Sequence, residues 1–129
     1  MSLAAEPKSL LRQRALARRG SLDPQTRALL TARLVEEGLA CARQWRARIV
    51  SAFSPIRDEP DALGLLCALG AEGFATALPV TVSRGAPLIF RLWRPGDVLV
   101  TERFSTMRPT GEVLAPDFLL VPLLAFDRR

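Results

Sequence analysis

A length of 129 residues and a mass of 14.2 kDa are typical of a single domain, and a hydrophobic fraction of 49% is ordinary for a globular core. The net charge of +5 favours an anionic partner such as a nucleotide, but the charges are spread along the chain and form no aromatic-studded basic stretch. Having no histidine excludes a Ser–His–Asp triad within these residues, and no apolar run approaches the roughly 20 residues that span a bilayer.

The first predicted element is a basic helix over residues 8–19, which are rich in good helix formers. Lys8 and Arg12 are four residues apart and so lie on the same helix face, where like charges repel unless an anion neutralises them. A phosphate chain would do so, although the spacing alone favours a solvated basic face. The charges in this segment interrupt any apolar region that a signal peptide needs, so we expect a cytoplasmic protein.

A second helix is predicted to begin at Asp23 and Pro24, since aspartate is a good N-cap and proline suits the first helical position. Apolar residues then recur at helical spacing through residue 45. Cys41 and Cys67 lie in apolar helical patterns without metal-ligand spacing, and we interpret them as small core residues in a reducing compartment.

A short strand over residues 49–53 leads into a loop over residues 54–61 that carries three carboxylates. Asp58 and Asp61 are explained as capping acids of the apolar helix predicted over residues 62–69. Glu59 is less well explained by capping. It follows the carboxyl end of a strand, which is where open α/β sheets bind ligands.

Further strands are predicted over residues 74–78, ending at Pro79, and over residues 88–93, pairing with residues 80–83 as a hairpin. Residues 94–97 are predicted to form a turn. Residues 97–116 are predicted to form a long loop, and loops of this length are often functional. The alternation of strands and helices indicates an α/β fold with a mainly parallel open sheet flanked by helices.

The most apolar stretch is APDFLLVPLLAFD, residues 115–127. Its length favours a central strand buried on both faces, with Pro122 where the strand leaves the sheet. Residues 123–127 would then form a loop at the carboxyl end of that strand. This stretch is either an ordinary core strand with a polar exit or one edge of a ligand site.

The ordered set of landmarks resembles the 5-formyltetrahydrofolate cyclo-ligases, also called methenyltetrahydrofolate synthetases, over essentially the whole chain. The landmarks are Lys8, Leu11 and Arg12; Asp23, Pro24, Arg27 and Thr31; residues 49–53; Asp58 and Glu59; residues 77–80; Phe90, Trp93, Pro95, Gly96 and Asp97; and PDFLLVPLLAFD at residues 116–127. The resemblance implies a three-layer, NagB/RpiA/CoA-transferase-like arrangement. It also implies an ATP- and Mg²⁺-dependent ligase that converts 5-formyltetrahydrofolate to 5,10-methenyltetrahydrofolate with release of ADP and phosphate.

The resemblance also implies roles for particular residues. Lys8 and Arg12 would bind the phosphates of ATP, and Glu59 would hydrogen-bond the folate. Four further residues would line the folate pocket: Ser54, Pro55, Ile56 and Phe104. For Phe104, a loop anchor packed on the core is an equal alternative. Asp127 would lie near the catalytic edge, where a structural role is the alternative, and no catalytic residue is assigned. We expect a monomer or weak homo-oligomer with a small-molecule substrate and neither a nucleic acid nor a membrane as partner.

Members of the family continue past the Phe-Asp landmark into a glycine-rich loop that wraps the triphosphate and supplies a metal-binding carboxylate. We therefore expect residues 1–129 to be a single α/β domain that forms the N-terminal portion of a longer cyclo-ligase domain, incomplete at its C-terminal side. On this interpretation the metal ligand lies beyond Arg129, and activity of the 129 residues alone stays open.

Two other functions are compatible with the sequence. One is a non-catalytic remnant that binds a nucleotide, folate or a partner chain through its open edge. The other is a basic nucleic-acid-binding module, whose affinity would fall steeply with salt.

Overall fold

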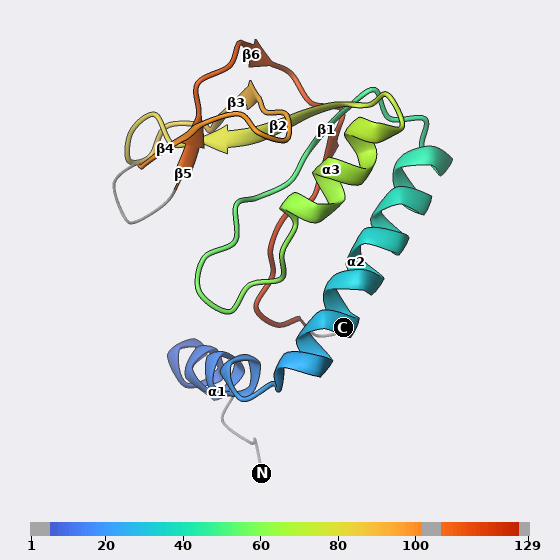
Figure 1. The fold of residues 1–129 in the computed structure, drawn as a ribbon. Helices are drawn as coiled ribbons and strands as arrows, with labels where there is room; N and C mark the ends of the chain where they lie inside the picture. The colour runs from blue at the N-terminus through green and yellow to red at the C-terminus, as the bar shows by residue number, and fades with distance from the viewer. Residues whose placement is uncertain (1–5, 102–106, 127–129) are drawn as a thin grey trace.

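The computed structural model describes residues 6–101 and 107–126 (Figure 1). Its helices are α1 (Lys8–Gly20), α2 (Pro24–Gln44) and α3 (Leu63–Ala71). Its strands are β1 (Ile49–Ser51), β2 (Ala75–Val80), β3 (Ile89–Leu92), β4 (Leu99–Thr101), β5 (Met107–Pro109), β6 (Val113–Leu114) and β7 (Phe118–Leu119). The result is a mixed α/β fold.

The main sheet has five strands in the order β6-β3-β2-β1-β7. β1 pairs in parallel with β2 and with β7, whereas β3 pairs antiparallel with both β2 and β6. β4 and β5 form a separate antiparallel pair. The described sheet is therefore mixed, and the prediction of a mainly parallel sheet is not confirmed, because the hairpin through β3 adds antiparallel pairs.

The start of α2 agrees with the sequence prediction. The Asp23 carboxylate accepts a 2.7 Å hydrogen bond from the backbone N–H of Thr26, and Pro24 is the first helical residue. This hydrogen bond lowers the pKa of Asp23, because it stabilises the ionised form. A single dipeptide thus sets the first residue of the helix.

The core lies between the sheet and the two later helices. α3 packs against β1 and β2, and α2 packs against α3 through Gly38, which lies beside the fully buried Leu65. An added Cβ at Gly38 would lie 2.5 Å from a Leu65 methyl group, so glycine permits the close approach of the two helices. The buried side chains are drawn mainly from α3 and the inner strands: Val50, Ala52, Phe53, Ala62, Leu65, Leu66, Leu69, Ala77, Leu78 and Trp93. A three-layer arrangement needs helices packed on both faces of the sheet. α1 buries no residue, so the described helices do not confirm this arrangement.

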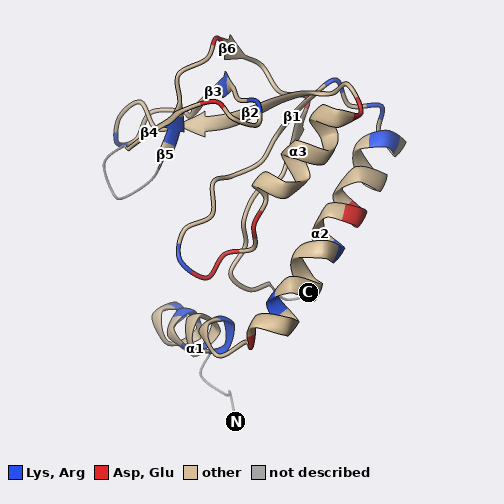
Figure 2. Ribbon diagram, viewed as in Figure 1, with Lys and Arg blue, Asp and Glu red and all other residues tan. Residues whose placement is uncertain are grey.

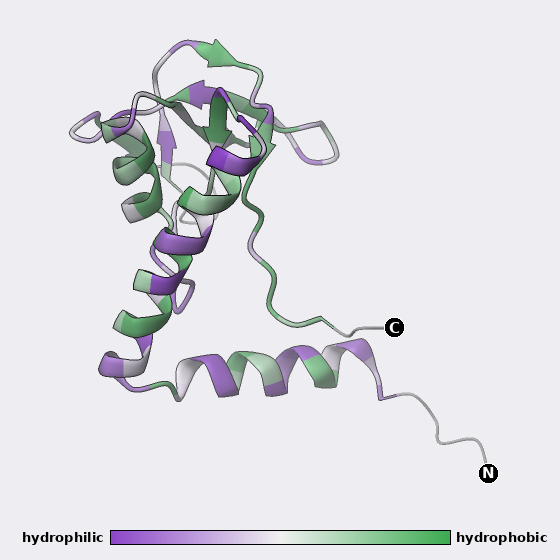
Figure 3. Ribbon diagram, turned by 90° about the vertical axis from the view of Figure 1, so that its right-hand side faces the viewer, coloured by the Kyte–Doolittle hydropathy of each residue, from purple (hydrophilic) through white to green (hydrophobic). Residues whose placement is uncertain are grey.

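The apolar stretch after Pro116 does not form the predicted central strand. β7 contains only Phe118 and Leu119 and lies at the edge of the sheet beside β1. Val121 is 65% exposed and Phe126 is 76% exposed, and Figure 3 shows this hydrophobic stretch running outside the helices. The apolar composition predicted a strand with both faces buried. Within the described residues, β7 instead pairs along one edge only, with β1, and Leu119 is exposed.

Three other predictions from the sequence are wrong. Residues 97–116 contain β4, β5 and β6 in their described part, rather than one long loop. β2 does not end at Pro79 but continues to Val80. At these two residues β2 pairs only with β3, because its pairing with β1 ends at Ala77, so the missing N–H of the proline is tolerated. Cys41 and Cys67 are exposed, because each lies on the outer side of its helix.

Asp117 joins the start of β7 to the start of β1. Its carboxylate accepts hydrogen bonds of 3.0 to 3.1 Å from the backbone N–H groups of Arg48 and Ile49. The hydrogen bond from Ile49 is the main reason that the pKa of Asp117 lies below its ordinary value of 3.8. The carboxylate thus fixes the register of β7 against β1.

Because this pKa is lowered in the folded state, the stabilisation by Asp117 is complete above pH 3.8 and is lost as the pH falls through the folded pKa. We expect Asp117→Asn to lower the urea midpoint at pH 7, and the difference from the wild type to shrink as the pH falls below 3.8. Urea unfolding of both proteins across this range measures the difference. A difference that does not shrink with falling pH would contradict the role of the charged form.

Candidate functional site

A hollow of about 160 Å³ lies where three segments meet. α1 contributes Arg12, Leu16 and Arg19, the loop after β1 contributes Glu59, and the segment after β7 contributes Pro122, Leu123 and Leu124. Figure 2 shows the basic side of α1 close to the acidic loop over residues 54–61. The hollow therefore joins segments that are far apart in the sequence.

The face of α1 that lines the hollow carries positive charge at both ends. Arg12, Leu16 and Arg19 are spaced by four and three residues, which places them on one side of a helix. Lys8 lies one turn before Arg12 on the same stripe, but it is exposed and is not among the lining residues. The hollow thus contains the Arg12 end of the predicted phosphate site and not the Lys8 end.

Glu59 is half-buried, and its carboxylate accepts a 3.0 Å hydrogen bond from the backbone N–H of Ile56. The bond closes a tight turn in which Arg57 has a φ of 54°, and it leaves carboxylate capacity facing the hollow. Asp61 accepts a 3.1 Å bond from the N–H of Leu63, at the start of α3, as the capping interpretation predicted. Glu59 itself caps no helix.

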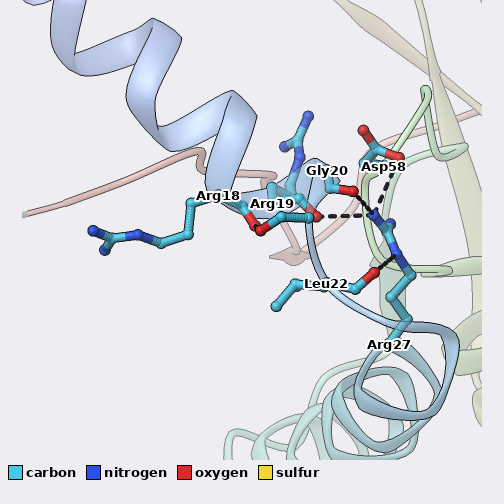
Figure 4. A network of polar contacts seen from close by, with 7 residues as sticks. Arg18, Arg19, Gly20, Leu22, Arg27 and Asp58 are labelled. Atoms are coloured by element: carbon cyan, nitrogen blue, oxygen red, sulfur yellow. Dashed lines mark hydrogen bonds and ion pairs between the residues drawn. The ribbon is translucent and has the colours of Figure 1, made fainter.

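Asp58 is not a helix cap either, because its Oδ1 forms an ion pair with Nη2 of Arg27 in α2, at 3.3 Å. The same guanidinium donates to the carbonyl oxygens of Arg19, Gly20 and Leu22 at 2.9, 3.2 and 3.0 Å (Figure 4). These carbonyls include the last ones of α1, which have no partner within the helix. Arg27 therefore fastens the C-terminal end of α1 to the loop that carries Glu59.

Arg19 is a lining residue that the sequence did not single out. Its Nε atom is buried and has no hydrogen-bond partner among the residues that the structure describes. Buried donors of this kind are rare, since leaving one unpaired costs roughly 1–3 kcal/mol. A helical spacing of seven residues from Arg12 was the one sequence signal that pointed to it.

The other predicted site residues have mixed placements. Ser54 and Pro55 are half-buried and Ile56 is exposed in the same loop as Glu59, but none of the three lines the hollow. Phe104 and Asp127 lie outside the described residues. Residues 6–101 and 107–126 contain no group of three or more Asp, Glu, Cys or His side chains that could hold a metal ion.

The hollow is suited to an oxyanion rather than to a whole cofactor. Two guanidinium groups and one carboxylate leave a positive balance, and guanidinium donors match phosphate and carboxylate oxygens. Its volume is below the roughly 300–1,000 Å³ of pockets that enclose small molecules. The described residues would thus hold the charged part of a ligand.

A scan against models of protein families found no match, and a search of curated proteins found none. Among solved structures, the fold is similar to the NMR structure of 5,10-methenyltetrahydrofolate synthetase from Aquifex aeolicus, with a TM-score of 0.76 and 25% sequence identity. The alignment covers 92% of this chain and 62% of that chain, so the chain spans about three fifths of its length. Among the described residues, no helix combines the length and the apolar character needed to cross a membrane. The resemblance to the 5-formyltetrahydrofolate cyclo-ligases that the sequence motifs indicated is thereby confirmed at the level of the fold.

Proposed function

We propose that this protein takes part in the ATP-dependent conversion of 5-formyltetrahydrofolate to 5,10-methenyltetrahydrofolate, as a cyclo-ligase. The observation that carries the proposal is the meeting of Arg12 and Glu59 in one hollow, within a fold similar to a methenyltetrahydrofolate synthetase. These residues come from α1 and from the loop after β1, and the resemblance assigned them to the two different substrates. The proposal includes the three-layer architecture for the family domain and a cytoplasmic location.

In this proposal, Arg12 and Lys8 hold the phosphates of ATP, which supplies the phosphoryl group that activates the formyl oxygen. Glu59 orients the folate, with Ser54, Pro55 and Ile56 beside it in the same loop. The charged groups provide positioning and neutralisation rather than a nucleophile, which agrees with a chain that has no histidine. Mg²⁺ is part of the proposal, and its ligands are not assigned.

The test is an absorbance assay for methenyltetrahydrofolate formation from 5-formyltetrahydrofolate and Mg-ATP, with circular dichroism to establish that the chain is folded. ATP-dependent turnover, absent when ATP is omitted, is the expected result. A folded chain that neither turns over nor binds ATP or 5-formyltetrahydrofolate in calorimetry would contradict the proposal.

A second function is binding of the same ligands without turnover. The small volume of the hollow favours it, because about 160 Å³ encloses only the charged part of each ligand and leaves the reacting part, which turnover requires to be positioned, outside. Saturable binding of ATP and of 5-formyltetrahydrofolate by a folded chain without turnover would select this function over the first.

Glu59→Gln separates the two substrates. We expect the affinity for 5-formyltetrahydrofolate to fall about tenfold, because a hydrogen bond to an ionised carboxylate is replaced by one to a neutral amide. The affinity for ATP should stay within about twofold, since the amide oxygen can still accept from the N–H of Ile56 and keep the loop in place. Isothermal titration calorimetry measures both affinities. Glu36→Gln, exposed on α2 and away from the hollow, is the matched control, and an equal loss for both ligands would contradict a folate-specific role.

A further inference from the structure

We propose that Arg19 is an oxyanion ligand of the hollow, acting beside Arg12, and that it binds either a phosphate of the nucleotide or a carboxylate of the folate. The inference deepens the proposed function by adding a residue to the same site. The Nε of Arg19 is buried and has no hydrogen-bond partner among the described residues.

The chemistry of the guanidinium defines what the missing partner is. All five of its N–H groups are donors, and it accepts no hydrogen bond, so the partner must be an acceptor. Ionised oxygens form the strongest hydrogen bonds with such donors. The only carboxylate that lines the hollow is Glu59, and none of the ion pairs within the described ranges joins it to Arg19 or to Arg12.

In the closed arrangement, the backbone at Arg19 is held against the loop after β1. Its carbonyl oxygen accepts from Arg27 Nη2 at 2.9 Å, and the same nitrogen also donates to the carbonyl of Gly20 at 3.2 Å. A Cβ added at Gly20 would lie 3.3 Å from an Asp58 carboxylate oxygen, so the end of α1 lies directly against the loop. With the backbone held, only the side-chain torsions of Arg19 remain to be ordered when it binds an anion.

Arg18 provides a natural comparison within the same helical turn. Its side chain is exposed and points away from this network, whereas the side chain of Arg19 is half-buried (Figure 4). The two residues carry the same charge and lie one position apart. Any effect of general electrostatic attraction would therefore be shared by both, and an effect of direct binding would be confined to Arg19.

The experiment titrates inorganic tripolyphosphate into the wild-type chain, Arg19→Ala and Arg18→Ala by isothermal titration calorimetry. We expect Arg19→Ala to weaken binding about tenfold or more, and Arg18→Ala to weaken it by less than about twofold. Arg19→Lys, which keeps the charge but loses the Nε donor and the planar fork, should bind with intermediate affinity. Equal losses in Arg19→Ala and Arg18→Ala, or a wild-type chain that binds neither tripolyphosphate nor 5-formyltetrahydrofolate, would overturn the inference.

Titrations with ATP and with 5-formyltetrahydrofolate identify the source of the oxyanion. A loss in Arg19→Ala that is confined to ATP assigns Arg19 to a phosphate, and a loss confined to 5-formyltetrahydrofolate assigns it to a carboxylate. Equal losses for both ligands, together with a lowered unfolding temperature, would indicate a structural role and overturn the inference. If tripolyphosphate binding depends on Arg19 but neither natural ligand binds, the oxyanion site stands and the proposed function fails.

Discussion

Replacing Arg12 by alanine is expected to lower the affinity for ATP by about tenfold to one hundredfold, while the affinity for 5-formyltetrahydrofolate stays within about twofold. The magnitude follows from losing one or two hydrogen bonds between a guanidinium and ionised phosphate oxygens, each contributing roughly 1.5–3 kcal/mol. Arg12 lines the hollow from an exposed helix that buries no residue. The substitution should therefore leave the unfolding temperature unchanged.

Arg14→Ala is the control for the loss of charge. Arg14 belongs to the same helix, is exposed, and forms a surface ion pair with Glu6 rather than lining the hollow. Isothermal titration calorimetry of both variants with ATP, and of Arg12→Ala with 5-formyltetrahydrofolate, gives the comparison. Arg12→Ala and Arg14→Ala having the same ATP affinity would remove Arg12 from the site.

The largest effect on stability is expected at Gly111. A Cβ added there would lie 2.3 Å from the carbonyl oxygen of Leu92, far inside van der Waals contact. Leu92 cannot move aside freely, because its N–H donates to the carbonyl of Glu112 at 2.8 Å and it pairs with Ala77 in the sheet. Gly111→Ala should lower the free energy of unfolding by about 2–3 kcal/mol, as for an overpacked core.

Gly70→Ala is the matched control, since a Cβ added at Gly70 in α3 meets nothing within 4 Å. We expect it to leave the stability unchanged or to raise it by up to about 1 kcal/mol, through the higher helix propensity of alanine. Urea unfolding of the two variants and the wild type provides the free energies. If Gly111→Ala is as stable as Gly70→Ala, the contact between Gly111 and β3 is not needed for folding.

Features that depend on neighbouring residues were predictable from the sequence. Asp23 and Pro24 determined the start of α2, because both the capping side chain and its N–H partner lie within four residues. Asp61 lies one residue before the N-cap Ala62 of α3, and its carboxylate accepts from the N–H of Leu63, two residues on. The turn over residues 94–97 was predictable for the same reason, and in it Asp97 accepts from the N–H of Arg94 at 2.8 Å.

Features that depend on what the chain meets in space were not predictable. The apolar run at residues 118–126 has the composition of a buried strand, yet only Phe118 and Leu119 pair, and they do so at the edge of the sheet. Gly111 has no local signal, since its role depends on Leu92. The exposed positions of Cys41 and Cys67 likewise follow from how α2 and α3 pack and not from their residue type.

The lining of the hollow was predictable only where the family motifs covered it. Arg12 and Glu59 were named from the resemblance, and they do line the same hollow. Arg27 was one of the landmarks, but its link to Asp58 and to three carbonyl groups required the structure. Arg19 had only its spacing from Arg12, because an unpaired buried nitrogen is a property of the folded chain.

The sparse attachment of α1 has a thermodynamic consequence for binding. A segment that buries no residue and is fastened mainly by one guanidinium can open while the sheet, α2 and α3 stay folded. A ligand that bridges α1 and the loop after β1 binds only the closed arrangement, so its apparent dissociation constant is the intrinsic one divided by the closed fraction. Saturating ATP should then slow amide hydrogen exchange in α1 but not in α3, and unchanged exchange in α1 would show that the helix is closed already. Arg27 would thus govern affinity without touching the ligand, through the population of molecules that are ready to bind.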